Sequence, residues 1–115
     1  MTIIRDNCTI TRVKLEWFKN SNGLFIVKLI DVPTSQLLAK STGDAIDGTA
    51  SVNLYNPIEP INTHPIALLQ NEMDSRVNQI SHGPADSNPV IEASREEFKF
   101  MYTCAAILCE SYLER

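Results

Sequence analysis

The sequence predicts an α+β fold, with a small N-terminal antiparallel β-sheet followed by a C-terminal antiparallel helical hairpin. The first half of the chain alternates between apolar and polar residues as strands do, and the second half contains two long stretches of helical periodicity. Strands that precede helices in this order favour α+β over a parallel α/β sheet. At 115 residues the chain has the length of one domain. We therefore expect residues 1–115 to form a single domain, β-rich over 1–60 and a helical hairpin over 61–115.

Two neighbouring strands are predicted near the N-terminus. Residues 9–18 place apolar side chains on one face and charged side chains on the other, which indicates a half-buried strand. Asn22 and Gly23 tolerate the positive φ angles of a type I′ hairpin turn, and residues 24–32 are rich in β-branched and aromatic residues. We expect these two strands to pair antiparallel.

The pattern weakens after the second strand. Over residues 33–48 it predicts a short helical turn at 35–40 and then a loop. Residues 49–55 predict a third strand. The proline-punctuated connector at 57–60 marks the expected boundary between sheet and helices.

The first helix of the hairpin is predicted to begin at Pro65, because proline suits the first helical position after a cap at Thr63 or His64. Apolar residues then recur at helical spacing, and we expect the helix to end near Ser81. Gly83 is interpreted as its C-cap glycine.

The second helix is predicted to start at Asn88, an N-cap residue followed by a proline, and to run toward Arg115. Its apolar stripe is wider than one partner helix can cover, so the sheet or another subunit must bury the excess. The stripe comprises Ile91, Phe98, Phe100, Met101, Cys104, Ala105, Ile107, Leu108 and Tyr112.

Composition limits the classes of partner. A net charge of -4 argues against a broad electrostatic footprint for long nucleic acid or an anionic membrane. Neither a membrane-length apolar run nor a signal peptide is evident, so we expect a cytoplasmic protein with no membrane partner. The three cysteines lack zinc-site spacing, which favours a reducing compartment and no bound metal.

Common catalytic and cofactor-binding motifs are missing: the sequence contains no GxSxG, GxGxxG, Walker loop or HExxH. Its two histidines, His64 and His82, lie beside helix-boundary signals, which favours structural roles. We therefore expect a binding protein with no enzymatic activity, no catalytic residues and no cofactor. An unrecognised hydrolase of cyclic nucleotides is the alternative among enzymes.

Basic and aromatic residues on the two helices suggest a site for a phosphorylated ligand. Arg95 and Lys99 are spaced i, i+4 on one helix face, and with Arg76 they can gather a phosphate or pyrophosphate. Phe98 and Tyr102 can stack on a nucleobase. The alternative is that these cations are ordinary surface charges that pair with neighbouring glutamates. The predicted ligand-binding residues are Arg76, Asn88, Arg95, Phe98, Lys99 and Tyr102.

The second helix also resembles a known family over residues 86–107. An Asp-Ser start, acidic positions, the pair Met101-Tyr102 and the run at 105–107, Ala-Ala-Ile, resemble the helical-hairpin domain shared by phage anti-CBASS sponges and phage Thoeris anti-defence sponges. Tyr102 stands where tryptophan is common in that family. The Thoeris-inhibitor branch joins a small N-terminal sheet to the hairpin, so the predicted architecture points to that branch.

The resemblance implies a phage-encoded sponge that acts in the host cytoplasm. Such a protein binds glycocyclic ADP-ribose, and some relatives also hold cyclic dinucleotides, without cleaving the ligand. It implies a homo-oligomer whose subunits share ligand sites. The main alternative is a phage inhibitor that binds a bacterial defence protein directly, and a structural virion component is a third hypothesis.

Overall fold

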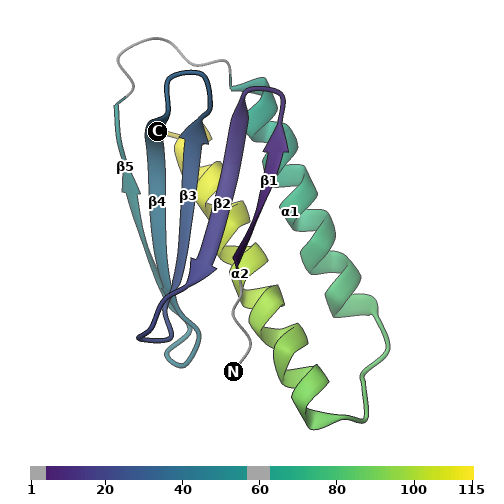
Figure 1. Ribbon diagram of the computed structural model, residues 1–115. Coiled ribbons are helices and arrows are strands. Elements are labelled where there is room, and N and C mark those ends of the chain that lie inside the picture. Colours follow the sequence, from purple (N-terminus) through teal and green to yellow (C-terminus); the bar gives the residue numbers. More distant parts are fainter. Residues whose placement is uncertain (1–4, 57–62) are drawn as a thin grey trace.

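The predicted α+β class is confirmed. A computed structural model describes residues 5–56 and 63–115 of the chain and places an antiparallel sheet before a helical hairpin (Figure 1). Its elements are β1 (Arg5–Ile10), β2 (Val13–Lys19), β3 (Phe25–Asp31), β4 (Gln36–Asp44), β5 (Thr49–Leu54), α1 (His64–His82) and α2 (Pro89–Leu113).

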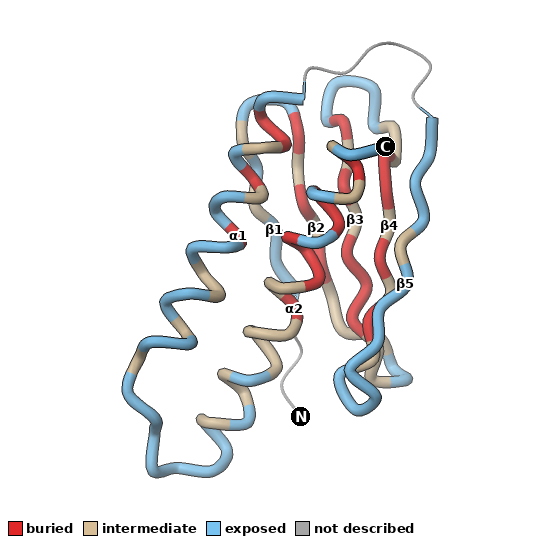
Figure 2. The backbone as a smooth tube through the Cα atoms, turned by 180° about the vertical axis from the view of Figure 1, so that it is seen from behind, coloured by how far each residue is buried: buried red, intermediate tan, exposed pale blue. Residues whose placement is uncertain are grey.

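The sheet is a meander in which each strand pairs antiparallel with the next, in the order β1-β2-β3-β4-β5. Residues that pair directly lie on the same face, so Trp17, Val27, Ser41 and Val52 form one row. The first three are buried, because both helices cover this face of the sheet (Figure 1, Figure 2). The described residues leave the opposite face uncovered.

The N-terminal part of the sheet corrects one prediction. Residues 9–18 do not form a single strand, because the chain turns at Thr11 and Arg12 between β1 and β2. Thr11 has a φ of 55°, a left-handed conformation that a continuous strand does not contain. The alternation that predicted the strand holds within β2, where Leu15 and Trp17 are fully buried.

The predicted hairpin between β2 and β3 is present, but its turn differs from type I′. Only Gly23 has a positive φ, at 81°, whereas a type I′ turn needs a second residue in that region. The side chain of Asn20 organises the turn instead, since its Oδ1 accepts hydrogen bonds from the backbone N–H groups of Asn22 and Leu24.

Residues 36–40 begin a strand, so the predicted helical turn at 35–40 is wrong. β4 pairs with β3, and its Leu38 and Ala39 are completely buried. Gln, Leu, Ala and Lys favour helices in isolation, but pairing with a central strand overrides that weak preference. The strand predicted over 49–55 is consequently the fifth, β5. The predicted boundary at 57–60 lies outside the described residues.

Both helices are confirmed, and α1 begins and ends within one residue of the predicted positions. Asn88 caps α2 as expected, because its Oδ1 accepts a hydrogen bond of 2.9 Å from the N–H of Val90. Gly83 follows α1 with a φ of -74°, so it is not the left-handed C-cap that the sequence suggested. Among the described residues, neither helix combines the length and apolar character needed to cross a membrane.

The sheet buries most of the wide apolar stripe of α2. Met101 and Leu108 are fully buried against it, whereas Ile107 remains 42% exposed. Gly43 in β4 permits the close approach of the helix. A Cβ atom at this position would lie 2.9 Å from Sγ of Cys104 and 3.0 Å from the ring of Phe100.

Replacing Gly43 with valine tests this packing. We expect Gly43→Val to lower the midpoint of thermal unfolding, measured by circular dichroism, because overpacking a core typically costs about 1–3 kcal/mol. Thr42→Val is the matched control, since Thr42 is the neighbouring residue on the uncovered face. If both variants melt like the parent protein, α2 does not pack this closely on β4.

Candidate functional site

A cavity of about 420 Å³ lies between the C-terminal half of α1 and the N-terminal half of α2. Its volume falls within the range of roughly 300–1,000 Å³ typical of small-molecule sites. It brings together four of the six predicted ligand-binding residues. The lining residues are Arg76, Gln79, Ile80, Arg95, Phe98 and Tyr102.

Aromatic rings form one wall of the cavity. Phe98 and Tyr102, one turn apart on α2, have ring centroids 5.9 Å apart and an interplanar angle of 28°. Trp17 of β2, which is fully buried, meets Tyr102 in an edge-to-face arrangement, with centroids 5.9 Å apart and an angle of 86°. Aromatic pairs favour this geometry. The sheet therefore supports the aromatic wall from behind.

Arg76 brings positive charge to this wall from α1. Its guanidinium carbon lies 5.3 Å from the ring centroid of Tyr102 and 5.9 Å from that of Trp17. Its Nε donates a hydrogen bond of 3.0 Å to Glu72, and no described carboxylate pairs with its two terminal nitrogens. Partial burial alone would lower the pKa of Arg76, but the bond to Glu72 and the nearby Tyr102 raise it above its usual value. Arg76 thus stays cationic and keeps terminal donors for an anion.

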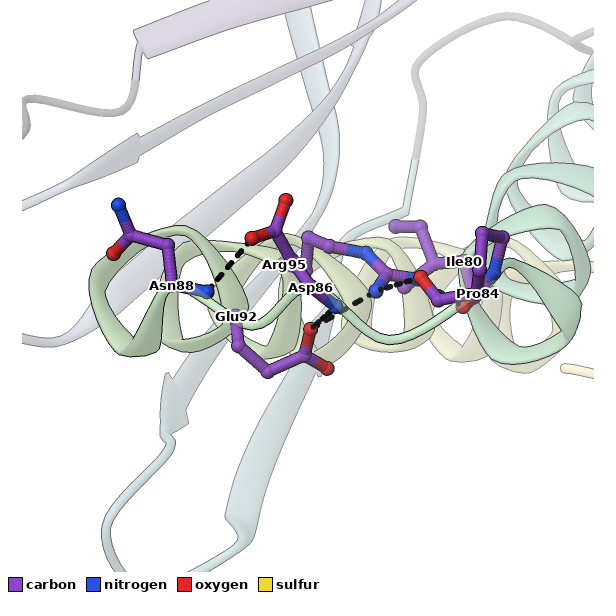
Figure 3. Close-up of polar contacts among 6 residues, drawn as sticks. All are labelled: Ile80, Pro84, Asp86, Asn88, Glu92 and Arg95. Atoms are coloured by element: carbon purple, nitrogen blue, oxygen red, sulfur yellow. Dashed lines mark hydrogen bonds and ion pairs between the residues drawn. The ribbon is translucent and has the colours of Figure 1, made fainter.

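Arg95, in contrast, holds the connection between the two helices together (Figure 3). Its Nη1 donates to the carbonyl of Pro84 at 2.8 Å and to the carboxylate of Glu92 at 3.0 Å, and its Nη2 donates to the carbonyl of Ile80 at 2.8 Å. Carbonyls in the last turn of a helix lack helical partners, so Arg95 satisfies an acceptor that α1 leaves open. A Cβ on Gly83 would lie 3.0 Å from Nη2, which explains glycine at that position.

The other two predicted residues, Asn88 and Lys99, do not line the cavity. Asn88 serves the start of α2: besides capping the helix, its backbone N–H donates to the carboxylate of Asp86 at 2.8 Å (Figure 3). Lys99 lies one turn after Arg95, but its side chain is not part of the lining. The i, i+4 spacing placed Arg95 and Lys99 on one face of α2. It did not show which of the two side chains faces the cavity beside α1.

Three residues of the site were not predicted. Gln79 and Ile80 follow Arg76 at i+3 and i+4, so helical spacing alone could have placed them beside it. Trp17 lies within residues 9–18, which the sequence predicted to form a half-buried strand, and its contact with Tyr102 depends on how α2 lies on the sheet. Only the tertiary structure reveals that contact.

The chemistry of the lining suits binding. None of the six lining residues is a carboxylate, histidine, serine or cysteine. Burial raises the pKa of the Cys104 thiol to about 11 and that of Cys109 to about 12, so both remain protonated and unreactive. Within residues 5–56 and 63–115, no group of three or more His, Cys, Asp or Glu side chains is arranged to hold a metal ion.

Comparisons with known proteins do not place the chain in a family. No protein-family model, curated protein or solved structure matches it. The resemblance of residues 86–107 to sponge hairpins therefore stays a prediction.

The contacts of Arg95 predict a structural effect for its replacement. Arg95→Ala should destabilise the free protein by about 1–2 kcal/mol, because three acceptors lose a charged donor at a largely exposed connection. Urea denaturation measures this loss. Lys99→Ala, which makes the same charge change on the same helix, is the control and should unfold like the parent. Equal midpoints for the two variants would contradict a structural role for Arg95.

Proposed function

We propose that this protein is a phage anti-defence sponge that binds and sequesters a cyclic nucleotide immune signal in the host cytoplasm. The proposed ligand is glycocyclic ADP-ribose or a cyclic dinucleotide. The observation that carries the proposal is the cavity between α1 and α2, where Arg76 lies beside the stacked pair Phe98 and Tyr102. A cation next to an aromatic wall suits a nucleotide ligand, because the cation can bind its phosphates and the aromatic rings can stack on its base.

Each part of the cavity can recognise one part of such a ligand. The terminal nitrogens of Arg76 can donate two parallel hydrogen bonds to phosphate oxygens. The rings of Phe98 and Tyr102 offer a surface for base stacking, which contributes about 1–3 kcal/mol. Gln79 adds an amide that both donates and accepts, as a base edge or ribose requires.

The size of these contributions supports a shared site. Two charge-assisted hydrogen bonds at about 1.5–3 kcal/mol each and stacking at about 1–3 kcal/mol reach at most about the 8 kcal/mol of micromolar binding once the entropic cost of association is subtracted. Tight sequestration therefore needs further contacts. A homo-oligomer in which a second subunit closes the open side of the cavity can supply them.

The residues of the cavity favour sequestration over cleavage. Hydrolysis of a phosphodiester or pyrophosphate needs a positioned base, nucleophile or metal. None of the six lining residues is a carboxylate, histidine, serine or cysteine, which are the side chains that most often act as base or nucleophile. We propose that the ligand is held intact.

A second candidate function is direct inhibition of a bacterial defence protein. The start of α2, at the end of the hairpin that projects beyond the sheet (Figure 1), exposes Val90 at 73% and Ile91 at 46%. Exposed apolar side chains side by side can anchor in a pocket of a partner protein. This observation favours a protein target independently of the cavity.

The sponge proposal is tested by thermal shift and calorimetry with glycocyclic ADP-ribose isomers, cyclic dinucleotides and linear ADP-ribose. We expect cyclic species to raise the melting temperature, since a ligand that binds only the folded state stabilises it. Arg76→Ala should weaken binding at least about tenfold, because a lost charge-assisted contact to phosphate corresponds to about 1.5–3 kcal/mol. Ligand recovered after denaturation should be chemically unchanged.

Two controls make the result specific. Glu72→Gln keeps Arg76 but weakens the ion pair that the described residues form with it, and it should retain binding. Lys99→Ala removes a cation outside the cavity and should also retain it. Binding that survives Arg76→Ala would move the site elsewhere, whereas no response to any nucleotide would favour a protein target.

A further inference from the structure

The uncovered face of the sheet, opposite the helices, has a composition of its own. We call it the outer sheet face. In β2 its residues alternate with the buried Leu15 and Trp17, and strand register assigns the residues of the other strands to the same side. Its members are Arg5, Asn7, Thr9, Lys14, Glu16, Phe18, Ile26, Lys28, Ile30, Leu37, Lys40, Thr42, Asp44, Thr49, Ser51 and Asn53.

Positive charge gathers on this face although the whole chain has a net charge of -4. It carries four basic residues and two acidic residues: Glu16, which pairs with Lys14 at 3.2 Å, and Asp44, at the end of β4. No described carboxylate forms an ion pair with Arg5, Lys28 or Lys40. By contrast, Arg76 and Arg95 on the helices each pair with a glutamate. The outer sheet face therefore holds uncompensated cations.

Two of these cations are placed at an energetic cost. Lys28 and Lys40 are direct cross-strand partners on β3 and β4. Like charges directly opposite each other destabilise a sheet, and their side chains begin only about 5 Å apart. An anion between the two ammonium groups would remove this repulsion. Glu16 of β2 is the direct cross-strand partner of Lys28 on its other side, but it forms its ion pair with Lys14.

Two cations of this face, Arg5 and Lys28, lie over the aromatic ring of Phe18. The guanidinium carbon of Arg5 lies 5.6 Å from the ring centroid of Phe18, and Nζ of Lys28 lies 5.7 Å from it. Cation–π attraction restrains both side chains near the surface of the sheet. Arg5, Lys28 and Lys40 thus form a basic strip with members on β1, β3 and β4, and the ring of Phe18 on β2 lies between the first two.

The acidic residues elsewhere do not cancel this strip. The molecule is 22 Å across even in its thinnest direction, whereas charges are screened over about 8 Å at physiological ionic strength. Exposed carboxylates such as Glu96 and Glu110 lie on α2, in the helix layer on the other face of the sheet. An anionic ligand on the outer sheet face experiences mainly the local cations.

The kind of surface favours nucleic acid over an acidic protein. Protein interfaces are depleted in lysine and depend on exposed aromatic or apolar anchors, but none of the exposed large hydrophobic residues belongs to the outer sheet face. Nucleic-acid interfaces are polar and positively charged. Hydroxyl and amide groups flank the basic strip, and such groups bind phosphate and sugar oxygens. These flanking residues are Asn7, Thr9, Thr42, Ser51 and Asn53.

We propose that the outer sheet face binds a short segment of single-stranded nucleic acid, with Lys28 and Lys40 on adjacent phosphates and Arg5 and Phe18 against a base or sugar. This site is separate from the cavity of the helical hairpin. The sheet accommodates a single strand because the described residues leave its outer face uncovered, and its cations recognise the backbone without regard to base sequence.

The test is fluorescence anisotropy with labelled oligothymidylate and oligouridylate of about twelve nucleotides, a length within the usual site sizes of single-strand binding folds. We expect the parent protein to bind with an affinity that falls as salt rises. Lys28→Gln/Lys40→Gln should weaken binding at least about tenfold and reduce the salt slope, because phosphate contacts are lost. Lys99→Gln/Arg115→Gln makes the same change in net charge away from the sheet and should bind as the parent does.

Each other outcome contradicts the proposal. Absence of binding to either oligonucleotide, or unchanged binding in Lys28→Gln/Lys40→Gln, would overturn it. Binding of a polyglutamate peptide as tightly as the oligonucleotides would assign the face to an acidic protein. Loss of oligonucleotide binding in Arg76→Ala would place the nucleic acid in the cavity instead.

Discussion

The contact of Trp17 with Tyr102 and Arg76 joins the sheet to both helices, and the candidate site depends on it. Trp17 of β2 is fully buried and meets Tyr102 of α2 edge to face, while Arg76 of α1 lies over both rings. The indole thus fixes the phenol, and the two rings fix the guanidinium. Because side chains alternate along a strand, a slip of β2 by one residue would turn Trp17 to the outer face and remove the support of the cavity wall.

Those parts of the fold that local signals specify were predictable. Asn88 caps α2, Pro65 lies in the first turn of α1, and helical spacing indicated the extent of both helices. The sheet was only partly predictable. The sequence predicted one strand across Thr11, but the positive φ of this residue separates β1 from β2. Residues 35–40 were predicted to form a helical turn because their side chains favour helices, whereas pairing with β3 makes residues 36–40 part of a strand. Where long-range pairing decides the structure, a local pattern does not determine it.

The candidate site divides in the same way. Arg76 of α1 and Phe98 of α2, two of the predicted ligand-binding residues, line one cavity, since both lie on the facing sides of the hairpin. Residue type and spacing could not distinguish an arginine whose N–H donors are free to bind a ligand from one whose donors already bind groups of the protein. Arg95 has the residue type and spacing of a phosphate ligand, yet three acceptors at the hairpin connection occupy three of its five N–H donors. Lys99 shares its helix face but not the cavity.

One irregularity in the sheet couples helix packing to the charge of the outer sheet face. The pairing of β3 with β4 shifts by one residue between Leu29 and Ile30. Without this bulge, continued pairing from Ile30 would set Lys40 opposite Val27, on the face that the helices cover. The extra residue instead turns Lys40 outward beside Lys28 and turns Gly43 inward beneath α2. The same local feature therefore gives α2 its close seat on the sheet and leaves the basic strip on the opposite side, so both candidate surfaces depend on a register that no local sequence pattern specifies.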